Sequence, residues 1–271
     1  MHRDRLPTAG LKDIASKLVS ARLAARPLKD YPGEIPQDLA TGYICQDFAI
    51  DLWPDEIRGW KVGRIPPALE DVFHSDRLAG PIFGRSIRHA SNGEALEMRV
   101  FEGGFAAIEA EFVAVIAADA PAGKTDWSLD EADAMIRDLR LGLEIASSPL
   151  RTINQLGPAV IVSDFGNNAG LIVGKSIRNW RERDLESMSC EAWIEGSSVG
   201  TGGAFRLTGG PVRSVQFMLQ LAAERGRPLH AGDLIATGQT TGIHEIAPGE
   251  LARIVFDGDG EVRCKAVAAS A

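Results

Sequence analysis

The sequence predicts an α+β protein that is rich in β structure and begins with a helical arm. Residues 11–25 carry apolar side chains at helical spacing, and residues 37–52 do so again after a loop rich in proline and glycine. Beyond Trp53-Pro54, short apolar runs alternate with glycine and proline, which favours strands. We therefore expect a helical arm over residues 1–55 and a β domain over residues 56–271.

The β domain is expected to contain two helices and ten strands. A helix over Ser128–Arg137 opens with Ser128 and Glu131 in the spacing of a capping box. A second helix, over Pro211–Glu224, has a proline in its first turn and an apolar face. The glycine-rich stretch Gly196–Gly210 indicates a loop or a hairpin. The expected strands are Ile57–Val62, Ala95–Phe101, Ala106–Ala117, Leu139–Ala146, Ala159–Val162, Leu171–Val173, Cys190–Ile194, Leu234–Thr237, Leu251–Phe256 and Val262–Val267.

The composition narrows the class of protein. Acidic residues outnumber basic ones by 37 to 29 in the 271 residues, and the resulting charge of −8 argues against a general nucleic-acid binder. No apolar run reaches the roughly 18–20 residues that span a bilayer, and no signal peptide is evident at the N-terminus. Cys45, Cys190 and Cys264 are widely spaced, as expected for reduced, buried thiols. We expect a cytoplasmic enzyme without a membrane or nucleic-acid partner.

Three carboxylates lie in segments that are otherwise apolar. Glu109 and Glu111 interrupt the run 105–116, and on a strand they would share one face with Cα atoms about 7 Å apart. Glu144 lies in a second apolar segment. Burying like charges together is costly unless a cation joins them or a proton neutralises one. Unless these strands expose one face to solvent, the three acids indicate an oxygen-ligand site for Mg²⁺ or Mn²⁺.

Lys61 is a basic counterpart to these acids. It lies between two apolar residues and two glycines in the segment 59–63. A lysine in such surroundings can serve in proton transfer. The alternative is a lysine at a strand end whose ammonium group reaches the solvent.

Two later loops have the composition of binding-site walls, although ordinary turns have it as well. The loop 162–170 contains Asp164 and Asn168, and the loop 232–242 contains Thr237 and Gly238. The five histidines show no zinc-ligand spacing, and no Gly-x-Ser-x-Gly motif is present. Hydrolysis by a nucleophilic serine or cysteine therefore has no support.

These residues together resemble the 2-keto-4-pentenoate hydratase/4-oxalocrotonate decarboxylase group of the fumarylacetoacetate hydrolase superfamily. The resemblance covers residues 11–267 and rests on the order and spacing of several motifs. The motifs are Gly59–Gly63, Gly80–Phe83, Glu109–Glu111, Gly142–Ile145, Ser163–Gly174, Gly210-Pro211 before a helix ending in Leu219–Ala222, Ala231–Gly238 and Pro248–Glu250.

The resemblance implies a rolled, mostly antiparallel β core of the fumarylacetoacetase C-terminal type, so that residues 56–271 form the catalytic domain. It implies that Glu109, Glu111 and Glu144 bind Mg²⁺ or Mn²⁺ and that Lys61 is the catalytic proton-transfer residue. Superfamily hydrolases use a His/Glu dyad instead, which His74 does not clearly supply. The substrate-binding residues expected here are Arg64, Phe83, Asp164, Asn168, Thr237 and Gly238.

Two of these residues depart from the pattern of the group. Arg64 stands where hydratases usually have an apolar residue, and it would pair with an additional anionic group of the substrate if it faces the site. A surface position is the alternative for this arginine. Asn168 stands where hydratases often carry serine.

The expected activity is hydration of a 2-hydroxy-2,4-dienoate, with enol and keto forms interconverting on the metal, as in the breakdown of aromatic compounds. The alternatives are decarboxylation of a 2-oxo-3-enedioate, C–C hydrolysis of an acylpyruvate, and a catalytically silent binding subunit. Resemblance to the group also suggests a homo-oligomer in which the N-terminal helices contribute to the interface.

Overall fold

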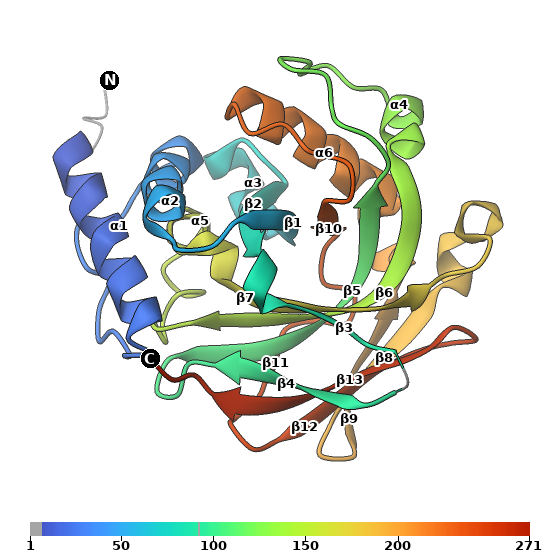
Figure 1. Cartoon of the computed structure of the whole chain (residues 1–271). Helices are drawn as coiled ribbons and strands as arrows, with labels where there is room; N and C mark the ends of the chain where they lie inside the picture. Colours follow the sequence, from blue (N-terminus) through green and yellow to red (C-terminus); the bar gives the residue numbers. More distant parts are fainter. Residues whose placement is uncertain (1–6, 92) are drawn as a thin grey trace.

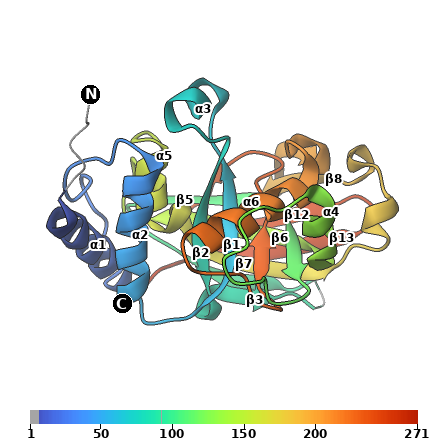
Figure 2. The same ribbon diagram turned by 90° about the horizontal axis from the view of Figure 1, so that it is seen from above.

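The N-terminal arm consists of two helices that lie side by side. The computed structural model describes residues 7–91 and 93–271, so the first six residues of the expected arm lie outside the described residues. Helix α1 spans Thr8–Leu23 and α2 spans Leu39–Leu52. Helix α2 packs against both α1 and the short helix α5, Pro158–Ser163, at one side of the molecule (Figures 1 and 2). A domain boundary near residue 55 stays a prediction.

The rest of the chain forms two sheets. The larger sheet has the strand order β2-β1-β10-β5-β6-β7-β3, with β11 added beside β5, and the smaller has the order β4-β13-β12-β8-β9. The strands of the larger sheet are β1 Ile57–Arg64, β2 Arg77–Phe83, β3 Ile87–His89, β5 Phe105–Ile116, β6 Ile136–Ser148, β7 Asn168–Ser176, β10 Leu234–Ala236 and β11 His244–Glu245. Those of the smaller sheet are β4 Ala95–Val100, β8 Ser189–Ile194, β9 Ser197–Gly203, β12 Leu251–Phe256 and β13 Gly260–Ala268.

Most of the strand pairings are antiparallel, and the long strands β5 and β6 curve across the molecule (Figure 1). Among the described residues, only the pairings of β1 with β10, β13 with β4 and β3 with β7 are parallel. The predicted β-rich α+β class with a rolled, mostly antiparallel core is therefore confirmed. The glycine-rich stretch after residue 196 forms the second strand of the β8–β9 hairpin.

Strand β5 is buried along its whole length because both of its faces are covered. On one face, the Phe112 ring packs against Phe256 of the smaller sheet, with ring centroids 5.5 Å apart. On the other face, Val113 and Val115 join a separate apolar cluster with Leu171. Side chains alternate between the faces of a strand, so Glu109 and Glu111 point to the same side as Val113. The strand thus carries two carboxylates into the interior.

The remaining helices are α3 Pro67–Phe73, α4 Leu129–Ala134 and α6 Gly210–Glu224. Helix α3 has no buried residue and projects from the molecule (Figure 2). The capping box of Ser128 and Glu131 is present at the start of α4, as predicted. None of the helices that the structure describes is long and apolar enough to cross a membrane.

Two local expectations were wrong. Ala159–Val162 is helical, within α5, and not a strand, because a short apolar run does not distinguish the two and Pro158 favours the first turn of a helix. The helix predicted over Ser128–Arg137 ends at Ala134, because β6 begins at Ile136 and pairs with β5. The fully buried strand β2 and the short helix α3 were not predicted.

Candidate metal centre

The pairing of β5 with β6 brings the three glutamates together. Glu109 lies directly opposite Glu144 on the neighbouring strand, and Glu111 lies opposite Gly142. A side chain at position 142 would meet Val113 and the Glu111 backbone, so glycine is needed for this close approach. One carboxylate oxygen from each glutamate lies within 4.8 Å of the others. The structure thus assembles the predicted triad in one buried cluster.

The hydrogen bonds of the triad leave part of it unsatisfied. Glu111 Oε2 accepts a hydrogen bond of 2.7 Å from the Gly238 amide, and Glu144 Oε1 accepts one of 3.1 Å from Asn168 Nδ2. Within residues 7–91 and 93–271, neither Glu111 Oε1 nor Glu144 Oε2 has a hydrogen-bond partner, although both atoms are buried. Buried oxygens normally have a partner, so these two are suited to accept a cation.

Lys61 reaches the cluster from β1. Its Nζ lies 3.3 Å from Glu144 Oε1 and 3.6 Å from Glu109 Oε2, and its side chain is buried. Burial by itself lowers the pKa of this lysine, but Glu109, Glu144 and Glu111 together raise it above its usual range. Lys61 is therefore held as an ammonium group beside the carboxylates. The alternative of a lysine whose ammonium group reaches the solvent is excluded by this burial.

The charges of the cluster fit a divalent cation. Three carboxylates and one ammonium leave a charge of −2 if all are ionised, and all four side chains are buried. Burial and the neighbouring carboxylates raise the pKa of Glu111 well above its usual value. Burial also raises the pKa of Glu144, to about 7. A divalent ion would supply the missing charge, and carboxylate oxygens are the ligands that Mg²⁺ and Mn²⁺ prefer.

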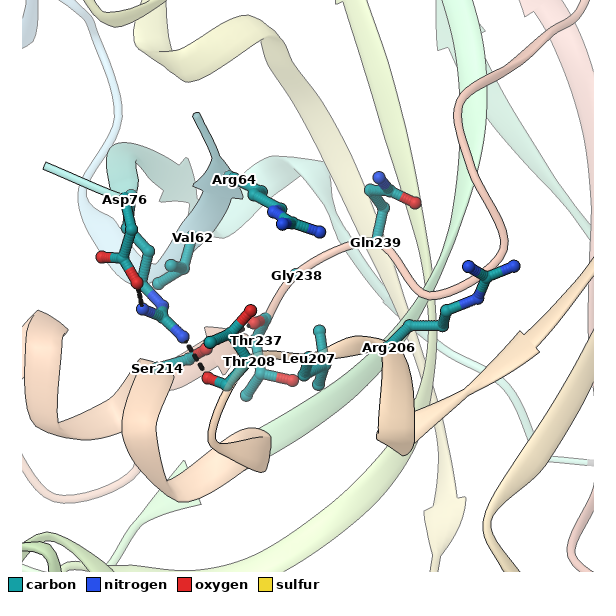
Figure 3. A pocket seen from close by; sticks show the side chains of 12 residues that line it. Val62, Arg64, Asp76, Arg206, Leu207, Thr208, Ser214, Thr237, Gly238 and Gln239 are labelled. Carbon is teal, nitrogen blue, oxygen red and sulfur yellow. Dashed lines mark hydrogen bonds and ion pairs between the residues drawn. The ribbon is translucent and has the colours of Figure 1, made fainter. Parts of the chain in front are cut away.

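A pocket, drawn in Figure 3, is lined by residues that include Gly238 and Gly63. It adjoins the cluster, because the Gly238 amide donates to Glu111 and Gly63 lies beside Lys61 Nζ. Arg64 and Arg206 line it and are exposed, and neither has an acidic partner among the residues that the structure describes. Arg77 also lines the pocket but binds the Asp76 carboxylate and the Thr208 carbonyl. The pocket therefore offers two unpaired guanidinium groups to an anionic ligand.

The structure places the predicted site residues in three positions. Arg64, Thr237 and Gly238 line the pocket, and Asn168 binds Glu144. The Thr237 hydroxyl donates to the Phe112 carbonyl and anchors its loop on β5. Asp164 and Phe83 have other partners, and for all six residues a role in substrate binding stays a prediction.

Asp164 and Phe83 contact residues that surround the site and do not line its pocket. Both carboxylate oxygens of Asp164 accept hydrogen bonds, one from Arg22 alone and one from Arg22 and Ser148. The Phe83 ring packs against Trp53 and Phe165, with centroid distances of 5.4 and 5.0 Å. These contacts hold the turn that precedes Asn168.

Sequence reasoning missed two arginines of this region. Arg22 is an arginine four residues after Leu18 on the apolar face of α1, and this placement signals a buried charge that needs a partner. Arg206 follows β9 in a stretch expected only to be a loop or hairpin, and nothing in its local sequence connects it with Arg64.

The comparisons with known proteins agree with this fold. No family model matches the chain. The fold is that of the fumarylacetoacetate hydrolase superfamily, as expected from the motifs. The structure of 4-oxalocrotonate decarboxylase from Pseudomonas putida G7, complexed with magnesium and adipate, matches with a TM-score of 0.78 and 21% identity over 97% of this chain and 99% of that chain. Fumarylpyruvate hydrolase from Pseudomonas aeruginosa, in complex with Mn²⁺ and pyruvate, matches with a TM-score of 0.56 and 18% identity over 79% of this chain and 91% of that chain.

Sequence similarity points to one branch of the superfamily. A 4-oxalocrotonate decarboxylase from Pseudomonas putida is 30% identical over 107 residues, which make up 40% of this chain and 40% of that protein. A second, from Pseudomonas sp., is 30% identical over 121 residues, or 44% and 45% of the two chains. The chain thus matches less than half the length of these curated relatives. The resemblance to the hydratase/decarboxylase group is confirmed at this level.

Proposed function

We propose that the protein is a divalent-metal-dependent enzyme that decarboxylates a 2-oxo-3-enedioate, the alternative activity considered from the sequence. The pocket beside the glutamates carries this proposal, because Arg64 and Arg206 provide unpaired cations for a second carboxylate. A hydratase substrate of the 2-hydroxy-2,4-dienoate type has an uncharged tail and would leave both cations without a partner. The similarity to 4-oxalocrotonate decarboxylases supports the same choice.

Different residues of the chain would act on the two ends of the substrate. Glu109, Glu111 and Glu144 would hold Mg²⁺ or Mn²⁺, which when bound supplies positive charge for the 2-oxo acid end. Arg64 and Arg206 would bind the distal carboxylate and place the chain of the substrate along the pocket. The distal carboxylate would leave as CO₂, and the electron pair of the C–C bond that held it would move through the 3-ene toward the 2-oxo oxygen.

Lys61 would move the proton in this reaction. Its Nζ lies beside Glu144 and Glu109, and these carboxylates keep it protonated in the metal-free site. A protonated amine at this position can donate to the developing negative charge of the substrate. The buried setting keeps bulk water from competing for that proton.

Offering several substrates to the purified protein tests the proposal. With Mg²⁺ or Mn²⁺ added, the protein should release CO₂ from a 2-oxo-3-enedioate and should leave an acylpyruvate intact. Addition of water to a 2-hydroxy-2,4-dienoate without any CO₂ release from the diacid would instead establish the hydratase. If no substrate reacts and no Mn²⁺ binds, the catalytically silent subunit is favoured.

The variant Arg64→Ala tests whether Arg64 binds the distal carboxylate of the substrate. Loss of a charge-assisted contact costs about 1.5–3 kcal/mol, so we expect kcat/KM for the diacid to fall by about 10–100-fold, while the inhibition constant of a 2-oxo monoacid, which lacks the distal carboxylate, is unaffected. Arg85→Ala is the matched control, because Arg85 is an exposed arginine outside this pocket. An equal loss of diacid turnover and of monoacid inhibition would contradict the role of Arg64.

We also propose that the protein assembles as a homo-oligomer through the N-terminal helices. Leu23, Ile44 and Leu52 of α1 and α2 are 45%, 38% and 52% exposed, so these helices offer apolar side chains to a second copy. Light scattering coupled to gel filtration should show more than one copy, and Leu52→Glu should shift the mass toward one copy. A monomeric wild-type protein would contradict this proposal.

A further inference from the structure

Arg22 connects the N-terminal arm with the surroundings of the metal centre. It lies in the last turn of α1, and its side chain is buried. Its Nε and Nη2 donate to the two carboxylate oxygens of Asp164 at 2.5 and 2.9 Å. Its Nη1 donates to the Asn168 carbonyl at 2.9 Å, and Nη2 also reaches the Ser147 carbonyl at 3.1 Å. One guanidinium group thus binds β6, β7 and the turn between α5 and β7.

The turn that Arg22 closes has an uncommon backbone. Phe165, Gly166 and Asn167 have φ values of 56°, 64° and 65°, so three successive residues are in the left-handed region. For Phe165 this conformation is unfavourable and persists only where the surroundings hold it. Arg22 binds the residue before this turn, Asp164, and the residue after it, Asn168. The guanidinium group therefore holds both ends of a turn that the chain would not adopt alone.

This turn touches the metal centre at two points. Asn168 donates through Nδ2 to Glu144 Oε1. A Cβ atom added to Gly166 would lie only 3.2 Å from Lys61 Cδ and 2.9 Å from Gly80 Cα, so the turn packs directly on the lysine stem. One contact orients a candidate metal ligand, and the other limits where the lysine can lie.

We infer that Arg22 is a positioning residue, which clamps the turn 165–167 so that Asn168 orients Glu144 and Gly166 confines Lys61. The inference rests on the metal-dependent reaction proposed above, but it concerns a residue of the helical arm that contacts no carboxylate of the triad. It makes the arm part of the catalytic unit. Removing the clamp should weaken metal binding even where the fold persists.

Mn²⁺ affinity is the readout, because it requires neither substrate nor turnover. Losing a group that orients a metal ligand commonly weakens metal binding by 10–100-fold. We expect Arg22→Lys, which keeps the charge but loses the forked hydrogen bonds, to raise the Mn²⁺ Kd by about tenfold. The double variant Arg22→Met/Asp164→Asn removes both charges, so no unpaired buried ion remains, and we expect it to raise the Kd at least as much. Circular dichroism establishes that each variant is folded, and free Mn²⁺ is measured by electron paramagnetic resonance.

Arg183→Met is the matched control. Arg183 forms a largely buried ion pair of 2.6 Å with Asp259 near the smaller sheet, away from the glutamates. Its loss should lower stability without changing the Mn²⁺ Kd. A Kd within twofold of wild type in a folded Arg22→Lys protein and in the folded double variant would overturn the inference. If the wild type binds Mn²⁺ but decarboxylates nothing, the proposed function fails and the Kd comparison still decides the role of Arg22.

Discussion

Two groups of buried carboxylates lie close together in this molecule, and they differ in how completely their oxygens are satisfied. Asp164 has both oxygens bound by Arg22, and Ser148 adds a third donor. The glutamate triad faces a single ammonium group and keeps two buried oxygens without a partner in the described chain. Burial is the same in both places, so it does not by itself mark a functional site. The unsatisfied oxygens do, because they indicate a ligand that the chain does not supply.

The largest expected effect follows from removing Lys61, which is the single ion-pair partner of the triad. Lys61→Ala should lower kcat by about 10²–10⁴-fold, the range typical of a lost proton-transfer group. The same change should leave the Mn²⁺ Kd unchanged or lower it, since it removes a positive charge 3.3 Å from Glu144. Steady-state kinetics and metal titration of one preparation measure both. An unchanged kcat would contradict the assignment.

Neutralising one acid in each group should affect the free energy of unfolding differently. Asp164→Asn leaves the Arg22 charge buried without a carboxylate and should lower the free energy of unfolding by about 3–5 kcal/mol. Glu111→Gln removes a charge that burial and its neighbours already disfavour, so the metal-free protein should be equally or more stable. Chemical denaturation of both variants without metal measures the difference. Equal destabilisation would show that the two groups are alike.

The pH dependence of metal binding should report on the glutamate triad and not on Asp164. The pKa of Glu144 is raised to about 7 in the metal-free protein, so this carboxyl is largely protonated below pH 7 and must lose its proton to bind an ion. Glu111 has a raised pKa as well and must also lose its proton, so we expect the Mn²⁺ Kd to rise by at least about tenfold for each pH unit below 7, with proton release on binding. Calorimetry in buffers of different ionisation enthalpy measures the released protons. A Kd that is constant between pH 6 and 8 would contradict the raised pKa.

The smallest expected effect concerns three buried thiols, which belong to neither group of carboxylates. Cys45, Cys190 and Cys264 are free and buried, as predicted. Burial raises the pKa of Cys45 to about 12 and that of Cys190 to about 11, so little thiolate forms at neutral pH. A thiol reagent should therefore label the native protein slowly and all three cysteines after unfolding. Rapid labelling of one native thiol would indicate local opening.

The triad was predictable because its signal is local. A charged residue within an apolar strand stands out in sequence, and the alternation of side chains places Glu109 and Glu111 on one face. The partners of the supporting residues have no such signal. Arg22, Asp164 and Arg206 act through partners 142 residues away or across a pocket, and only the folded chain brings them together.

The secondary structure shows the same division. The long strand β5 was placed within one residue at each end, because it combines length with a continuous apolar pattern. The run Ala159–Val162 is too short for its pattern to distinguish a helix from a strand. In the folded chain it is helical and packs beside α2. Strand β2 carries a proline and a glycine, and its pairing with β1 compensates for their weak strand propensity.

The alignment of β5 with β6 also has a consequence for how the chain folds. The two strands are joined by residues 117–135, and they pair over almost their full length. A slip of β5 by one residue would turn Glu109 and Glu111 toward the layer of Phe256 and bury two charges in hydrocarbon. Misaligned hairpins are thereby penalised before any ion is present. Glu109 and Glu111 therefore also favour the correct alignment of β5 with β6 while the sheet assembles.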